Sequence, residues 1–312
     1  MISKAYYLAT ALLAVAAAVT SAHASSTDPD VVVSAEWLRA HASDPNLVII
    51  AVDMPSMGDM PEGYTSGHIP GARVLDFHSI ASGMGGGRSQ LSSELVSPDS
   101  LRSIFESLGI SNDSHIVVYS SARQPVLVTR TFFTLDYIGL GEHLSVLDGG
   151  LDAWKAAGGA IEKGAPRNYT RGLLRTNPRA DVLASGPWLR QHLSDPSFAL
   201  IDARAPEFYT GEKLGHAASG VGHIPSAHNL YFATLVDDRG FFKPTGEARA
   251  MFANAGATMS KPLVVYCHIG QTATVVYLEA RRLGIPVKLY DGSFEDWSKH
   301  SDYPVAKGNA PQ

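Results

Sequence analysis

Short apolar runs alternate with amphipathic stretches along most of this chain. The runs Leu47–Val52 and 115–119 are typical of buried strands. Between them, Ser97-Pro98 predicts the start of a helix and Gly109 predicts its end. The apolar positions of this helix fall on one face and are Leu101, Ile104, Phe105 and Leu108. Strands that alternate with helices in this way predict an α/β fold with mainly parallel sheets.

The second half of the chain repeats the pattern. An apolar strand is expected over 262–266, a helix over 273–283 and a further strand over 287–290. Thr245 is expected to cap a helix that runs through Phe252. Residues 267–272 form a short loop after the strand at 262–266. Functional loops of parallel sheets lie at such carboxyl ends of strands.

Four pairs of segments resemble each other in the same order. They are 34–45 with 185–196, 67–72 with 222–227, 117–120 with 264–267, and 147–154 with 290–297. A spacing of roughly 150 residues indicates a duplicated domain rather than a solenoid. We expect an N-terminal domain at 31–160, a linker at 161–180 and a C-terminal domain at 181–305.

The first residues have the pattern of a removable leader. Lys4 precedes an apolar run from Tyr6 to Val19, and Ala22-His23-Ala24 supplies an A-x-A pattern. This predicts a secretory signal over residues 1–24, so that the mature chain is periplasmic or secreted. A membrane anchor is the alternative, but about 14 apolar residues fall short of the ~20 that span a bilayer.

Composition narrows the function classes. The 312 residues carry a formal net charge of −5 and no basic blocks, which argues against a nucleic-acid or membrane-surface partner. A hydrophobic content of 45% is that of a globular chain. The chain has one cysteine, so it has no internal disulfide, C-x-x-C pair or cysteine-based zinc cluster.

That cysteine, Cys267, opens the loop at 267–272. A strand–loop–helix arrangement directs backbone N–H groups and the positive end of the helix dipole at the sulfur, which favours a reactive thiolate. A buried structural cysteine is the alternative. The first repeat has Ser120 at the matching place, with Arg123 and Pro125 where the second has Gly270 and Thr272. We therefore expect the first domain to be inactive and to wall one side of the site.

These motifs resemble the two-domain sulfurtransferases of the rhodanese superfamily. The resemblance rests on two G-H-I-P segments, Asp202-Ala203-Arg204, the Cys267 loop and the segment 291–297. It implies two tandem rhodanese-like domains, each a small parallel sheet flanked by helices. It further implies transfer of a sulfane sulfur from thiosulfate or 3-mercaptopyruvate to cyanide or a thiol, through a cysteine persulfide. Small-molecule donors and acceptors are the expected partners, and no metal or organic cofactor is required.

The expected site follows from the loop. Cys267 is the nucleophile, and the loop is expected to form an anion cradle that contacts the substrate. Asp202 and Arg204 lie at a nearby strand end, either as site residues or as a plain salt bridge. The remaining expected substrate-contacting residues are His268, Ile269, Gly270, Gln271 and Thr272.

Two departures leave the donor open. Thiosulfate-type members of the family carry basic residues just after the cysteine, where this chain has His268 and Ile269. The family often has an arginine four residues beyond the one matching Arg204, where this chain has Phe208. Both differences remove positive charge that would hold an anionic donor. In another loop, Arg239 and Lys243 are either a source of cations for the site or, as is commoner, solvated charges.

Several other residues are expected to be structural. His68 and His223 occur in both repeats, including the one without a cysteine, which favours a role in a turn. Asp148 and Asp291 are expected in turns before helices. Ser293 with Asp296 is expected to form a capping box.

Two rival functions use the same cysteine. A cysteine phosphatase or arsenate reductase needs an arginine at the end of a longer loop, but the sixth residue after Cys267 is Ala273. A non-enzymatic sulfur carrier or a redox-sensing binding module is the alternative from another class. Turnover with a sulfur donor and cyanide separates it from an enzyme.

Overall fold

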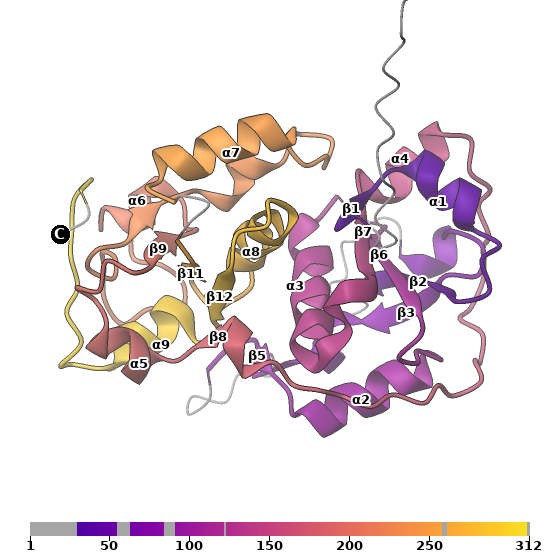
Figure 1. Ribbon diagram of the computed structural model, residues 1–312, viewed down its shortest axis with the longest axis horizontal. Coiled ribbons are helices and arrows are strands. Elements are labelled where there is room, and N and C mark those ends of the chain that lie inside the picture. The colour runs from indigo at the N-terminus through magenta and orange to yellow at the C-terminus, as the bar shows by residue number, and fades with distance from the viewer. Residues whose placement is uncertain (1–29, 55–62, 84–90, 122, 258–260, 311–312) are drawn as a thin grey trace, which may run out of the picture.

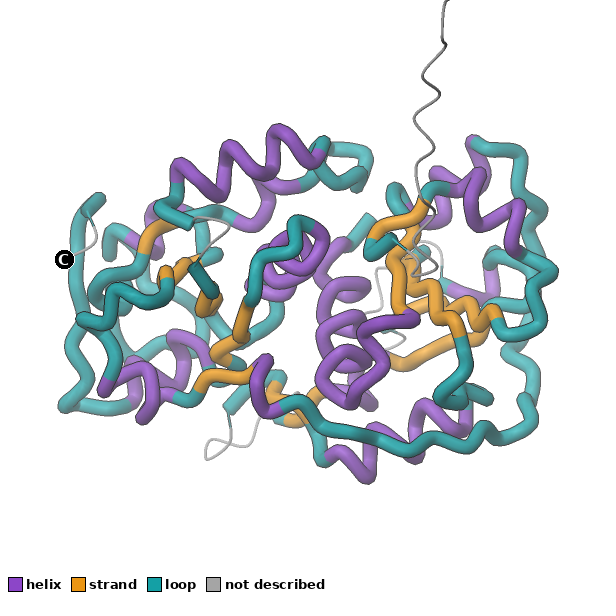
Figure 2. The backbone as a smooth tube through the Cα atoms, in the orientation of Figure 1, coloured by secondary structure: helices purple, strands orange, loops and turns teal. Residues whose placement is uncertain are grey.

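The computed structural model describes residues 30–54, 63–83, 91–121, 123–257 and 261–310. The expected secretory signal lies outside these residues. The chain forms two α/β halves, with the N-terminal half on the right of Figure 1 and the C-terminal half on the left. Two helices, one from each half, lie side by side between the two sheets, as Figure 2 also shows.

The N-terminal half contains a five-stranded parallel sheet in the order β1-β7-β6-β2-β3. Its strands are β1 (Val32–Val33), β2 (Leu47–Asp53), β3 (Arg73–Asp76), β6 (His115–Ser120) and β7 (Leu144–Leu147). The helices around it are α1 (Ala35–His41), α2 (Pro98–Ser107), α3 (Pro125–Leu135) and α4 (Gly150–Ala156). A separate antiparallel pair, β4 (Ala81–Ser82) with β5 (Glu94–Leu95), reaches toward the C-terminal half.

The C-terminal half repeats this topology, with strand order β10-β9-β11-β12-β8 and all neighbours parallel. Its strands are β8 (Leu183–Ala184), β9 (Ala199–Asp202), β10 (His228–Asn229), β11 (Leu263–Tyr266) and β12 (Val287–Tyr290). Its helices are α5 (Gly186–Gln191), α6 (Pro206–Tyr209), α7 (Thr245–Asn254), α8 (Ala273–Arg282) and α9 (Ser293–Lys299). The prediction of two tandem α/β domains with small parallel sheets is confirmed.

Local signals account for the elements that position the site. Ser97 caps α2 by accepting a hydrogen bond from Ser100 N, and Leu101 and Phe105 bury the apolar face. α8 ends before Gly284, whose φ of +74° suits a residue without a Cβ. The expected cap at Thr245 is wrong, because Thr245 is the first residue of α7 and Pro244 occupies the cap position.

The paired helices α3 and α8 join the two halves. Thr129 Oγ1 lies 2.8 Å from Thr274 Oγ1, and the rings of Phe133 and Tyr277 meet edge to face at 5.0 Å. Apolar side chains of both sheets belong to one continuous core cluster. A shared core makes the two domains one packed unit rather than two hinged bodies.

Two similar clasps reinforce the interface. Asp291 Oδ2 accepts a hydrogen bond of 2.9 Å from Leu95 N, and Asp148 Oδ1 accepts one of 2.9 Å from Phe242 N. In each clasp, the aspartate that follows the last strand of one sheet in chain order, β7 or β12, holds a crossing loop of the other domain. These aspartates were expected in turns, and the structure adds that they bind across the domain boundary.

Residues 161–179, which connect the two domains, lie against the surface of the N-terminal domain. Gly172 N donates to Glu106 O over 2.8 Å, and Arg179 N donates to Tyr137 O over 2.7 Å. In Figure 1 this segment passes alongside α2 on its way to β8. The segment therefore straps the N-terminal domain before the second sheet begins.

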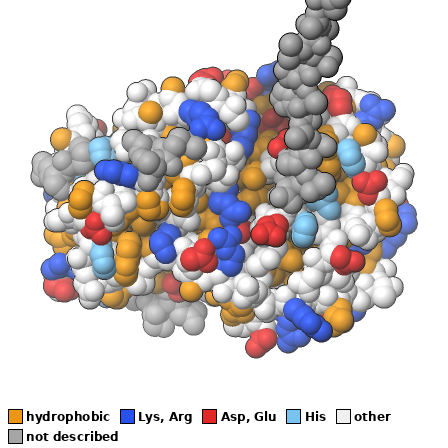
Figure 3. Space-filling model, viewed as in Figure 1, with side chains coloured by type: hydrophobic (Ala, Val, Ile, Leu, Met, Phe, Trp, Pro, Cys, Tyr) orange, Lys and Arg blue, Asp and Glu red, His pale blue; other side chains and the backbone are white. Residues whose placement is uncertain are grey.

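Acidic and basic side chains are interspersed over the face shown in Figure 3. Among the described residues, none of the helices has the length and apolar character needed to cross a bilayer. In the same part of the chain, no cluster of three or more His, Cys, Asp or Glu side chains is arranged to hold a metal ion.

Candidate active site

Cys267 lies directly after β11, at the carboxyl end of the central strand of its sheet. The loop 267–272 follows, and α8 begins at Ala273. Cys267 is 1% exposed, so its sulfur sits below the surface at the start of the loop. The expected strand–loop–helix arrangement around the cysteine is thus present.

The first turn of α9 holds the start of this loop. Phe294 N donates to Cys267 O over 3.1 Å, and Glu295 N donates to His268 O over 2.9 Å. Cys267 N donates to Ser293 Oγ over 3.1 Å. A trans peptide carries its C=O and N–H on opposite sides, so these bonds turn the N–H groups of His268 and Ile269 away from α9. Fixed N–H donors of this kind suit an anionic sulfur.

Gly270 makes the tight part of the loop. Its φ is +77°, and a Cβ there would lie 2.3 Å from Asp291 O. Both the backbone conformation and the close approach require glycine. The loop is therefore pressed against the segment that follows β12.

The rest of the loop is half-buried. Gln271 Nε2 donates to Ser93 Oγ of the N-terminal domain over 2.8 Å, so this domain does wall part of the loop. Thr272 precedes α8 and its hydroxyl caps none of the helix N–H groups in the described structure. Ile269 is partly exposed beside them.

Asp202 and Arg204 form a buried pair below the loop. Arg204 Nη2 lies 2.5 Å from Asp202 Oδ2, and a second guanidinium bond goes to Gly222 O at 2.7 Å. Burial acts to lower the pKa of Arg204, but Asp202 and, to a smaller extent, Cys267 raise it on balance. Asp202 pairs with Tyr266 in the sheet register, so the pair lies near the residue before the cysteine. The pair is a buried salt bridge in which Asp202 compensates the charge of Arg204.

His268 points into an aromatic neighbourhood. Its ring centroid is 4.7 Å from that of Phe208 and 4.5 Å from that of His216. Burial, followed by the charge of Arg204 and by His216, lowers the pKa of His268 to about 4. His268 is therefore neutral at pH 7 and brings no positive charge to the loop. Phe208, which stands where the family often has an arginine, adds none either.

The expected capping box at Ser293 and Asp296 is wrong. Gly292 holds the cap position of α9, and Ser293 adopts a φ of +53°. Ser293 Oγ instead accepts from Cys267 N and donates to Tyr290 O, while Asp296 accepts from the Tyr290 hydroxyl over 2.6 Å. Ser293 thus supports the cysteine, a role that its Asp-Gly-Ser setting alone does not reveal.

The histidines of the two G-H-I-P segments have the same surroundings. His68 stacks on Tyr64 at 3.7 Å and its Nδ1 lies 2.9 Å from Tyr64 O. His223 stacks on Tyr209 at 3.8 Å and its Nδ1 lies 2.8 Å from Tyr209 O. Matching contacts in the domain with and the domain without a cysteine support the structural interpretation.

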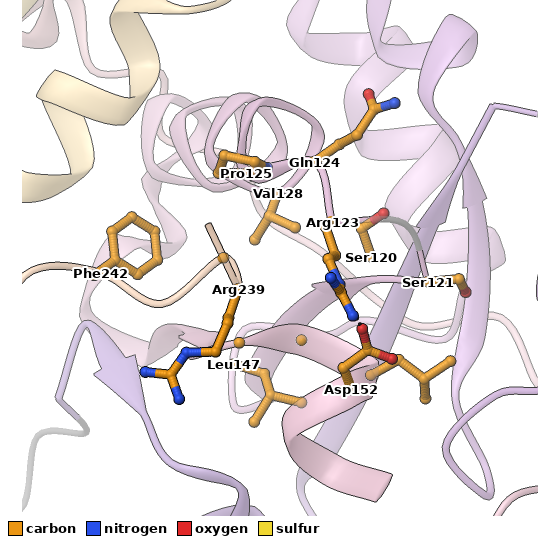
Figure 4. Close-up of a pocket in the computed structure, with 14 residues that line it drawn as sticks. Ser120, Ser121, Arg123, Gln124, Pro125, Val128, Leu147, Asp152, Arg239 and Phe242 are labelled. Carbon is orange, nitrogen blue, oxygen red and sulfur yellow. Dashed lines mark hydrogen bonds and ion pairs between the residues drawn. The ribbon is translucent and has the colours of Figure 1, made fainter. Parts of the chain in front are cut away.

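The counterpart site at Ser120 is a small pocket. Figure 4 shows Arg123 and Asp152 pointing toward one another, and their side chains pair at 2.7 Å. The cavity there has a volume of about 30 Å³, which is room for about one water molecule. Arg239 lines this cavity and pairs with Asp237, while Lys243 pairs with Glu247, so both cations are engaged away from the Cys267 loop.

Replacement of Ser120 by alanine should leave turnover within about twofold of the parent, because a cavity of about 30 Å³ is too small for a sulfur donor. Steady-state kinetics with the preferred donor, alongside a melting curve, check this. A tenfold fall in turnover at an unchanged melting temperature would show that the N-terminal loop takes part in the chemistry.

Comparisons with known proteins agree with this geometry. The family model of the rhodanese-like domain matches the chain twice, over residues 34–157 and 185–300. The chain belongs to the rhodanese family, in its tandem-domain form.

The relatives cover nearly the whole chain. A 3-mercaptopyruvate sulfurtransferase of Escherichia coli is 33% identical over 283 residues, which are 88% of this chain and 96% of that protein. The sulfur carrier protein TtuD of Thermus thermophilus is 30% identical over 293 residues, 90% of this chain and 98% of that protein. The crystal structure of SseA from Escherichia coli, described as a 3-mercaptopyruvate sulfotransferase, superposes with a TM-score of 0.73 at 30% identity, covering 85% of this chain and 99% of that one.

Proposed function

We propose that this protein is a sulfurtransferase that carries a sulfane sulfur on Cys267. The proposal rests on the geometry of the Cys267 loop. The carbonyls of Cys267 and His268 accept hydrogen bonds from α9, so the N–H groups of the same two peptides point away from α9. The relatives named as sulfurtransferases support it, since they align over most of the chain.

The reaction has two balanced half-reactions. With thiosulfate, the Cys267 thiolate attacks the outer sulfur, the S–S bond breaks, and sulfite leaves with the electron pair. With 3-mercaptopyruvate, the thiolate takes the sulfur, the C–S bond breaks, and the proton of the donor thiol ends on the carbon of pyruvate. In both cases the enzyme holds Cys–S–S⁻. Cyanide or a thiolate then attacks the outer sulfur and releases the Cys267 thiolate.

Mass spectrometry tests this function most directly. The purified protein is exposed to each donor, and the peptide that contains Cys267 is weighed before and after cyanide is added. We expect the gain of one sulfur and its loss to cyanide as thiocyanate, with many turnovers per enzyme. A peptide whose mass never changes with any donor would contradict the proposal.

A sulfur carrier is the second candidate, because one of the relatives is named as such. A carrier would load Cys267 with sulfur and release it only to a protein acceptor. Single loading without catalytic turnover of cyanide or small thiols would favour the carrier over the enzyme.

Thiosulfate should be a weak donor with a high KM. It is a dianion, and His268, which is neutral with its pKa of about 4, adds no cation beside the cysteine. Replacement of His268 by arginine should lower the KM for thiosulfate by roughly 3- to 10-fold, while the neutral His268→Gln should not. Kinetics on the three proteins with thiosulfate and mercaptopyruvate provide the test. A parent KM for thiosulfate in the low micromolar range would contradict the electrostatic argument.

We also propose that the protein is exported, from the apolar run before Ala22-His23-Ala24. The mature chain should begin at Ser25. N-terminal sequencing of the natural protein after cell fractionation checks this, and an intact Met1 in the cytoplasm would contradict it.

A further inference from the structure

Arg130 is a fully buried cation that the reaction described above does not use. It lies on α3 of the N-terminal domain and is 0% exposed. Its Nη1 donates to Gly270 O over 3.0 Å and to Asp291 Oδ1 over 2.5 Å, and its Nη2 donates to Ser93 O over 2.6 Å. One guanidinium thus binds the cysteine loop, the segment after β12 and the crossing segment of its own domain.

These contacts grip the loop at two successive residues. Arg130 binds the carbonyl of Gly270 directly. Ser93, whose carbonyl Arg130 also binds, has a φ of +62° and takes the side-chain amide of Gln271 on its hydroxyl. The far half of the loop is therefore fixed from the N-terminal domain, whereas α9 fixes the near half.

The bond to Gly270 sets the direction of one peptide group. Its carbonyl faces Arg130, so the N–H of Gln271, on the other side of the same trans peptide, faces away from Arg130. The carbonyls of Cys267 and His268 are tied to α9 in the same manner. Three peptide groups of the loop are thereby held in fixed orientations.

The repeat makes Arg130 specific to the cysteine loop. Arg130 follows Ser120 by ten residues, and Tyr277 follows Cys267 by ten residues. Tyr277 is its counterpart by this spacing, and it donates its hydroxyl to Asp136 over 2.7 Å. The duplicated positions thus differ in chemistry, and the buried arginine of the pair is the one that reaches the loop with the cysteine.

We propose that Arg130 is a positioning residue, through which the N-terminal domain holds the Gly270–Gln271 peptide in the orientation that sulfur transfer requires. The proposal rests on the sulfurtransferase function proposed above. It gives the inactive domain a part in the reaction without any contact between Arg130 and substrate.

The planar, forked shape of the Arg130 guanidinium allows it to bind several acceptors at once. Its two terminal nitrogens serve three acceptors in different directions, and Asp291 balances its charge. A lysine keeps the charge against Asp291 but presents a single nitrogen, so it cannot hold the Gly270 and Ser93 carbonyls in the same geometry. Arg130→Lys is therefore the informative variant, and its retained charge favours folding.

The experiment measures the thiolate of Cys267 against pH, by ultraviolet difference absorbance between each protein and the same protein carrying Cys267→Ser. A single cysteine in the chain makes the signal unique. In Arg130→Lys we expect the midpoint of ionisation to rise by about one pH unit and sulfur transfer to fall by roughly 10- to 100-fold. Tyr277→Phe is the matched control, because it removes another buried bond between the domains, and it should change neither readout.

An unchanged midpoint in a folded Arg130→Lys would overturn the proposal, whatever its turnover. Equal losses in Arg130→Lys and Tyr277→Phe would also overturn it, since they would reflect the interface alone. If Arg130→Lys does not fold, Asp291→Asn removes the carboxylate that shares Nη1 of Arg130 with the Gly270 carbonyl. Loss of that negative charge alone would lower the midpoint, so a rise would report loss of the loop orientation. A midpoint at or below that of the parent would then overturn the proposal.

The thiolate readout needs no substrate. If the parent protein transfers no sulfur from any donor but Arg130→Lys still raises the midpoint, the proposed function fails and the positioning role stands. If the parent transfers sulfur but Arg130→Lys leaves the midpoint unchanged, the proposed function stands and the positioning role fails.

Discussion

Replacing Cys267 by serine should abolish sulfur transfer, by at least about 10³-fold, while the fold survives. The hydroxyl of serine cannot carry a persulfide, and the described structure offers no other thiol. The change is nearly isosteric at a buried position, so we expect the free energy of unfolding to fall by no more than about 2 kcal/mol. Steady-state turnover and a denaturant unfolding curve on both proteins provide the measurement.

Ser120→Ala serves as the control for this prediction, since it alters the matching place of the other repeat. Loss of transfer in Cys267→Ser and its retention in Ser120→Ala would assign the chemistry to one domain. Substantial turnover by Cys267→Ser would exclude the persulfide mechanism.

Replacing Gly270 by alanine should impair both the loop and the reaction. The added Cβ would lie 2.3 Å from Asp291 O and 2.7 Å from Asp291 Oδ1, at a φ of +77°. The left-handed conformation alone costs about 1–2 kcal/mol for a residue with a side chain, and the overlap forces the loop away from Asp291. We expect sulfur transfer to fall by more than about 10-fold, as for the loss of a positioned donor.

Gly284→Ala separates these two effects. Gly284 has a φ of +74°, and a Cβ there would meet nothing within 4 Å. Gly284→Ala should lose stability only because alanine disfavours the left-handed backbone conformation, and it should keep its turnover. Melting temperatures and turnover are compared for the two variants, and equal turnover in both would show that the contact between Gly270 and Asp291 is irrelevant to the reaction.

Duplication followed by divergence explains the arrangement of the site. Both domains keep the stacked histidines and the aspartate clasp, since these hold each fold and the interface. They differ at the loop after the central strand, where one has the cysteine and the other a small cavity beside Ser120. The N-terminal domain contacts the cysteine loop through Arg130 and Ser93.

Sequence alone predicted the repeat, the alternation of strands and helices, and the position of Cys267 at the end of a strand. These features are local, because periodicity, capping residues and glycines act over a few neighbouring residues. Strand β12 at Val287–Tyr290 and helix α8 from Ala273 follow the predicted ranges closely for this reason. The pairing of Asp202 with Arg204 also involves residues two positions apart.

Tertiary structure decided what surrounds the sulfur. Arg130 and Gly270 are 140 positions apart, and no pattern near either residue indicates their contact. The local sequence predicts a helix cap at Ser293, but its hydroxyl accepts a hydrogen bond from the backbone of Cys267 across 26 positions. His268 is neutral at pH 7 because burial beside Phe208 and His216 lowers its pKa, and this burial arises only when distant segments pack. Local sequence thus placed Cys267 at the end of a strand, whereas long-range packing decided the hydrogen bonds and charges around it.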